Sequence, residues 1–112
     1  MKSTRLAALP DPPYYAVVFT SQRTSDDPGG YGAMADEMQE LASKQPGYLG
    51  IESARGPDGV GITVSYRATT EAITAWKAVA EHAAAQRLGR DRWYEAYELR
   101  VCRVERAYGF QR

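Results

Sequence analysis

The sequence predicts an α+β domain of ferredoxin-like type: element order βαββαβ, one four-stranded antiparallel sheet and two helices on one face. Three observations predict it. Four segments are rich in β-branched and aromatic residues, two have apolar residues at helical spacing, and a tight-turn sequence joins the middle two strands. Because βαβ crossovers are right-handed, this order brings both helices to the same side of the sheet.

The chain has 112 residues, enough for one domain. We expect residues 1–13 to form a flexible, proline-punctuated arm and residues 14–112 to form the folded domain. The 14 basic and 14 acidic residues balance, which argues against a nucleic-acid partner, and the sequence lacks an apolar run long enough for a membrane span. Cys102 is the only cysteine, which excludes an internal disulfide and fits a cytoplasmic location.

The first strand is predicted over Tyr14–Ser21, where both faces are apolar and therefore expected to be covered. A loop over residues 22–30 follows, because Asp27-Pro28-Gly29-Gly30 is typical of a turn. The first helix comes next and ends at Pro46-Gly47. Its apolar side is formed by Tyr31, Met34, Met38 and Leu41.

A hairpin is predicted next, from strands over Tyr48–Ala54 and Val60–Tyr66 that flank Gly56-Pro57-Asp58-Gly59. Thr69-Thr70-Glu71 then starts the second helix, since a hydroxyl cap followed by an acidic residue favours a helix N-terminus. This helix is expected to run to about Leu88, before Gly89. Its apolar stripe is Ile73, Trp76, Ala80 and Ala83.

The last strand is predicted over Tyr97–Tyr108, after a further helical turn at Arg90–Glu95 that carries Trp93. The apolar alternation changes phase between Val101 and Val104, which predicts a β-bulge near Cys102-Arg103. The sheet face opposite the helices needs a cover that only the arm or another molecule can supply. We therefore expect a homodimer in which two sheets face one another as a dimeric α/β barrel.

Several blocks of the sequence resemble the antibiotic-biosynthesis-monooxygenase family, above all a bacterial branch of monooxygenase or haem-degrading-monooxygenase-like proteins. The resemblance covers about residues 14–110. The matching blocks are Tyr15–Ser21, Gln45–Gly50, Gly61–Tyr66, Ile73–Lys77 with His82, and Trp93–Tyr97. It implies the dimeric α+β barrel and a cofactor-independent monooxygenase that acts on an aromatic or quinone-like small molecule.

Two other functions stay open. Some family members bind and degrade haem with a Trp and a His ten residues apart on the second helix and an Asn on the first strand. Trp76 matches that Trp, but Gln86 stands at the His position and the first strand has no Asn. The third possibility is a non-catalytic ligand-binding or interaction dimer, because the fold does not fix the function.

Two residues are candidates for catalysis. His82 is the natural proton acceptor near neutral pH, and Trp76 is a stacking wall for an aromatic substrate. The alternatives are a half-exposed helix histidine and an ordinary core aromatic. Candidate substrate-binding residues are Tyr66, Arg67, Gln86, Trp93 and Tyr97.

Arg67 stands where the resembled branch usually carries a Trp. It would meet an anionic substrate or a haem propionate, or else be a strand-end charge in water.

Overall fold

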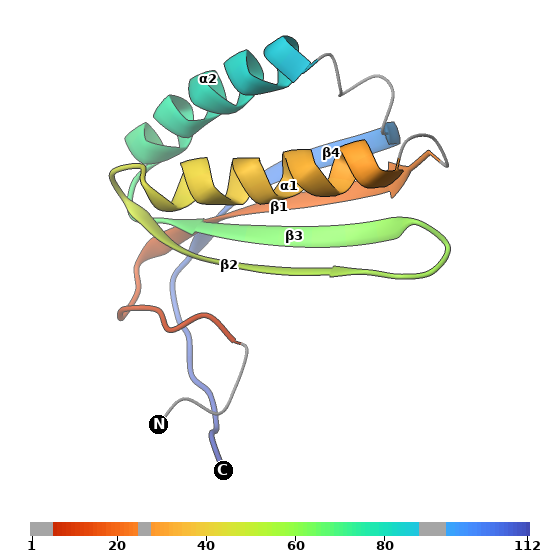
Figure 1. Cartoon of the computed structure of the whole chain (residues 1–112). Coiled ribbons are helices and arrows are strands. Elements are labelled where there is room, and N and C mark those ends of the chain that lie inside the picture. The colour runs from red at the N-terminus through yellow and green to blue at the C-terminus, as the bar shows by residue number, and fades with distance from the viewer. Residues whose placement is uncertain (1–5, 25–27, 88–93) are drawn as a thin grey trace.

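The computed structural model describes residues 6–24, 28–87 and 94–112, with only the backbone described for residues 28–34 and 83–87 (Figure 1). The predicted element order is confirmed. The elements are β1 (Tyr14–Arg23), α1 (Pro28–Ser43), β2 (Tyr48–Arg55), β3 (Val60–Arg67), α2 (Thr70–Arg87) and β4 (Tyr94–Val104).

The four strands form one antiparallel sheet in the order β2-β3-β1-β4. Both helices lie on the same side of this sheet, and β1 and β3 form its centre (Figure 1). This arrangement confirms the predicted ferredoxin-like α+β fold. In the part of the chain that the structure describes, neither helix combines the length and apolarity that a membrane crossing requires.

The predicted hairpin between β2 and β3 is confirmed. The Gly56 amide donates to the Val60 carbonyl at 2.9 Å, and the Val60 amide donates to Asp58 Oδ1 at 3.1 Å. Gly59 has a φ of 90°, a conformation that favours glycine. Turn chemistry thus fixes the register in which β2 and β3 pair.

The two helix starts differ in how well the sequence predicted them. Thr69 caps α2 as expected, because its Oγ1 accepts a hydrogen bond of 3.0 Å from the Ala72 amide. In contrast, α1 begins at Pro28, inside the predicted loop over residues 22–30. Proline is favoured in the first turn of a helix, where its missing N–H costs no hydrogen bond, so this turn sequence opens the helix instead.

The last strand corrects two predictions. It begins at Tyr94 rather than Tyr97, so the described end of the predicted helical turn, residues 94–95, belongs to β4. It ends at Val104, short of the predicted Tyr108.

The bulge predicted near Cys102-Arg103 is also wrong. Pairing with β1 runs without a break from Tyr14↔Val104 to Gln22↔Ala96, and the register shift lies beyond it, at Gln22/Arg23. The apolar residues change phase because Val104 faces the other side of the sheet from Val101, where it lies opposite buried Tyr14.

The register assigns residues to the two faces of the sheet, since directly opposed residues of antiparallel strands share a face. Arg67 lies opposite Tyr15 on the side of the helices, and Tyr66 lies opposite Ala16 on the far side. Part of the arm covers the far face, where the Ala7 amide donates to Glu52 Oε2 at 3.0 Å.

Candidate functional site

Arg67, the last residue of β3, is the centre of the candidate site. Its side chain is 0% exposed and is the largest fully buried side chain among the described residues. It lies opposite Tyr15 of β1 and Tyr48 of β2, at the end of the sheet where β3 passes into α2. The interpretation of Arg67 as a strand-end charge in water is therefore wrong.

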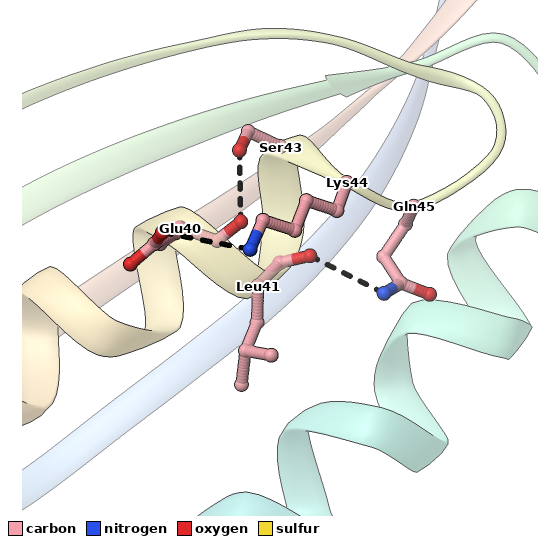
Figure 2. Close-up of polar contacts among 5 residues, drawn as sticks. All are labelled: Glu40, Leu41, Ser43, Lys44 and Gln45. Atoms are coloured by element: carbon pink, nitrogen blue, oxygen red, sulfur yellow. Dashed lines mark hydrogen bonds and ion pairs between the residues drawn. The ribbon is translucent and has the colours of Figure 1, made fainter.

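Tyr48 is placed beside Arg67 because α1 ends at Ser43 and a short turn leads from it into β2. The last carbonyls of a helix need donors from outside the helix ladder. Figure 2 shows two of them: Ser43 Oγ donates to the Glu40 carbonyl at 2.8 Å, and Gln45 Nε2 donates to the Leu41 carbonyl at 3.2 Å. An ion pair of 3.5 Å joins Lys44 Nζ to Glu40. These contacts end α1 and direct the chain into β2.

Gly47 joins this turn to α2. Its φ is 82°, and a Cβ placed on it would lie 2.6 Å from the Ala72 Cβ, which is closer than two non-bonded carbon atoms approach. The Gly47 carbonyl also accepts a hydrogen bond of 2.8 Å from the Ala68 amide. Trp76 follows Ala72 by four residues and shares its side of α2. Close contact at Gly47 thus brings Tyr48 and Trp76 to the same arginine.

Two aromatic rings pack on the guanidinium group of Arg67. Its Cζ is 5.1 Å from the centroid of the Tyr48 ring and 5.1 Å from the centroid of the Trp76 ring. Both distances lie within the range of cation–π attraction. The aromatic rings stabilise the cation, but they supply no hydrogen-bond acceptors in the plane of the guanidinium group.

The hydrogen bonds of Arg67 are incomplete. Nε donates to Ser65 Oγ at 3.1 Å, whereas Nη1 and Nη2 are buried and have no hydrogen-bond partner among the described residues. Burial lowers the pKa of Arg67, and the neighbouring Tyr48 hydroxyl acts in the opposite direction. Buried donors are nearly always satisfied in proteins, so two unpaired nitrogens on one buried cation are an unusual feature.

The structure brings Trp76 and Arg67 together, but it places Tyr66 elsewhere. Tyr66 lies on the far face of the sheet, where its hydroxyl donates to Glu52 Oε1 at 2.7 Å. Its ring packs edge-on against Tyr14, with centroids 5.9 Å apart. Burial, the hydrogen bond to Glu52 and the charge of Glu52 raise the pKa of Tyr66 to about 12.

Tyr97 lies on the helix side but at the other end of the sheet. It is opposite Ser21, six residues along β1 from the partner of Arg67, which corresponds to about 20 Å of strand. There it packs against Phe19, with ring centroids 5.4 Å apart. The structure therefore separates Tyr97 from Arg67.

His82 is exposed. It follows Trp76 by six residues, which turns it by about 120° around α2 from Trp76. The catalytic role of His82 stays a prediction. The side chain of Gln86 and the whole of Trp93 lie outside the described residues.

Comparison with known proteins shows the family. No protein-family model matches the chain. The uncharacterized protein YqjZ of Bacillus subtilis strain 168 is 50% identical over 106 residues, which cover 95% of this chain and 92% of YqjZ. The chain belongs to the YqjZ family.

Solved structures show that this YqjZ relative shares the fold of antibiotic biosynthesis monooxygenase domain proteins. SnoaB, a cofactor-independent oxygenase from Streptomyces nogalater, superimposes with a TM-score of 0.69 at 12% identity, over 86% of this chain and 97% of SnoaB. A candidate antibiotic biosynthesis monooxygenase from Nitrosomonas europaea gives a TM-score of 0.69 at 14% identity, over 81% and 89% of the two chains.

Sequence reasoning missed two residues of the site in this YqjZ relative. Tyr48 and Ser65 lie in predicted strands and in blocks that carry the family resemblance, but neither is among the candidate site residues of the sequence analysis. The signal for Ser65 was its spacing, because residues two apart on a strand share a face. The signal for Tyr48 was its position directly after Pro46-Gly47, because a glycine permits another element to approach closely.

Acidic side chains line a hollow next to the site, and Tyr48 belongs to both. A shallow hollow of about 330 Å³ is lined by Asp36, Gln39, Glu40, Ser43 and Tyr48. Among the described residues, no three His, Cys, Asp or Glu side chains are grouped so that they would hold a metal ion. Nor does any described carboxylate form an ion pair with Arg67.

Proposed function

We propose that this protein is a small monooxygenase that acts on an aromatic or quinone-like molecule without a bound cofactor. The observation that carries the proposal is the buried Arg67 cation, which lies beside Trp76 and has free donors on Nη1 and Nη2. SnoaB, a cofactor-independent oxygenase with the same fold, supports the reaction class.

The proposed chemistry uses the electrons of the substrate. In an aromatic ketone such as anthrone, a CH₂ group that is conjugated with the carbonyl through the aromatic rings loses a proton, and the ketone becomes an enolate. The enolate gives two electrons to O₂ and forms a C–O bond, and loss of water from the resulting peroxide leaves a new carbonyl. In total, CH₂ and O₂ become C=O and H₂O, so no external reductant is consumed.

The residues of the site would act on the enolate. A buried cation stabilises a developing anion more strongly than an exposed one, because the surroundings screen it less. Trp76, half-buried on α2, would supply a flat surface for the aromatic body. The role proposed for His82, acceptance of the substrate proton, has to be compatible with its exposed position and is tested below.

Oxygen uptake tests the proposal. Purified protein is mixed with anthrone, an aromatic ketone with an acidic CH₂ group, and O₂ consumption is measured against Arg67→Met. We expect one O₂ consumed per quinone formed by the wild type and at most the spontaneous rate for the variant. If a wider panel of aromatic ketones and phenols gave no uptake above that rate, the monooxygenase proposal would fail and the non-catalytic ligand-binding dimer would replace it.

The haem alternative has less support from the described residues. Haem iron is most often held by an axial His or Cys, and Met or Tyr serve in other haem proteins. His82 is the one histidine of the chain and is exposed, and Cys102 is exposed as well. Titration with hemin, followed by absorbance near the Soret band, checks this conclusion against His82→Ala.

We also propose that two copies pair through the far face of the sheet. Val60 and Ile62 on this face are 41% and 49% exposed, and Tyr108 and Phe110 beyond β4 are 90% and 82% exposed. Exposed apolar groups of this size favour an interface. Light scattering should give the mass of a dimer for the wild type and of a monomer for Ile62→Glu; a monomeric wild type at micromolar concentration would contradict the pairing.

A further inference from the structure

The two unpaired nitrogens of Arg67, Nη1 and Nη2, have a defined geometry. The guanidinium is a planar fork, and its two terminal nitrogens present parallel N–H bonds that match two oxygens in one plane. Nε is already bonded to Ser65 Oγ, which holds the side chain in place. The two rings at 5.1 Å cover parts of the group without using the in-plane donors. A bidentate anion would therefore supply the two acceptors that Nη1 and Nη2 lack among the described residues.

We infer that Arg67 is a recognition site for an aromatic anion with two coplanar oxygens, a carboxylate or the enolate of a hydroxy-ketone, held between Nη1 and Nη2. The inference rests on the proposed function for the aromatic body of the ligand. It adds the charged group of the ligand and the residue that binds this group.

Burial supports this inference. A cation that is 0% exposed loses its hydration. The described residues replace that hydration with only one hydrogen bond and two ring contacts. No described carboxylate neutralises it, so a ligand with one negative charge would complete both the hydrogen bonds and the charge. A structural arginine normally has its own partner inside the protein, as half-buried Arg55 has in buried Ser21, whose Oγ accepts a hydrogen bond of 2.8 Å from Nη2.

The aromatic lining supports the second half of the ligand. Tyr48 is half-buried on β2 and Trp76 is half-buried on α2, so neither residue is fully enclosed by the protein. Aromatic pairs prefer offset or edge-on packing, which a flat ligand attached to the anion can adopt beside Arg67. A small inorganic anion would satisfy the fork but would leave these ring surfaces unused.

The test compares two probes of the same shape. Calorimetry measures the binding of 1-naphthoate, an aromatic carboxylate, and of naphthalene-1-carboxamide, which is neutral and isosteric. We expect the wild type to bind the carboxylate and not the amide. Binding of neither probe, or equal binding of both, would overturn the inference, whatever happens to the variants.

Three variants identify the residue. Arg67→Met should abolish binding and raise the Tm of the free protein by about 4 °C or more, because it removes an unpaired buried charge. Arg67→Lys keeps the charge but loses the fork, and should weaken binding by about tenfold or more. Arg103→Met is the matched control, since its side chain is 53% exposed, and should bind like the wild type.

The results separate this inference from the proposed function. Unchanged affinity in Arg67→Met, or affinity lost equally in Arg103→Met, would overturn the role of Arg67. If 1-naphthoate bound through Arg67 while no aromatic substrate consumed O₂, the inference would stand and the monooxygenase proposal would fail. If oxygen uptake survived in Arg67→Met, the reaction class would stand, and the role of Arg67 in binding the substrate would fail.

Discussion

Gly47 and Ala72 are in such close contact that a Cβ on the glycine would lie 2.6 Å from the Ala72 Cβ. This contact joins the turn before β2 to the first part of α2. It thereby sets the distance between Tyr48 and Trp76, the two rings that pack on Arg67.

The first prediction concerns this contact. Gly47→Ala should lower the free energy of unfolding by about 2–4 kcal/mol, because alanine is strained at a φ of 82° and its Cβ pushes against Ala72. Urea unfolding measures it. Gly109→Ala is the matched control, since a Cβ there would meet nothing within 4 Å, and it should be neutral. Equal stability of the two variants would show that the contact is not tight.

The second prediction concerns Trp76. Trp76→Leu should weaken the binding of 1-naphthoate and lower turnover by about tenfold, because the ring that stacks on Arg67 and on the proposed substrate is lost. Calorimetry and oxygen uptake measure the two effects. Since Trp76→Phe retains a ring, it should recover part of both. Turnover that is unchanged in Trp76→Leu would remove Trp76 from the site.

The third prediction concerns the pKa of Tyr66, which is raised to about 12 from its ordinary value of 10.0. The unfolded chain loses this proton first, so the contribution of Tyr66 to stability is complete below pH 10 and is lost as the pH rises toward 12.

Absorbance of tyrosinate should show one transition near pH 12 that is missing in Tyr66→Phe. In Glu52→Gln the midpoint should fall only part of the way, because burial, the largest cause, remains. If the wild type showed no tyrosinate transition near pH 12, the burial of Tyr66 and its hydrogen bond to Glu52 would be contradicted.

The fourth prediction concerns His82. If this side chain accepts the substrate proton as proposed, His82→Ala should lower turnover by about tenfold or more. Oxygen uptake makes the measurement. Because His82 is exposed and is turned by about 120° from Trp76, a change of less than about twofold would remove it from the proposed mechanism.

The fold could be predicted from the sequence because its signals are local. Val60–Tyr66 alternates, Thr69 caps a helix, and Gly56–Gly59 forms a turn, and each of these patterns acts over a few residues. The bulge near Cys102-Arg103 was a wrong prediction because the change of phase at Val104 reflects which element covers each face. Neighbouring residues along the chain do not contain that information.

The candidate site could be predicted only in part. Trp76 and Arg67 were found from their types and from the family resemblance, but nothing local indicated that Arg67 would be fully buried. It is covered by Tyr48 and Trp76, and Tyr48 follows Gly47, which is 20 residues away from Arg67 in the chain and contacts α2 at Ala72. Tyr66 was misplaced because a strand end has two faces, and only pairing with β1 decides which one meets the helices.

A crystal structure with 1-naphthoate tests the central claim most directly, namely that Arg67 is buried with its terminal nitrogens reserved for an anion. The account predicts both carboxylate oxygens at about 3 Å from Nη1 and Nη2, with the naphthalene ring against Trp76 or Tyr48. A structure in which Nη1 and Nη2 are bonded to groups of the protein itself, and the naphthoate lies elsewhere, would contradict it.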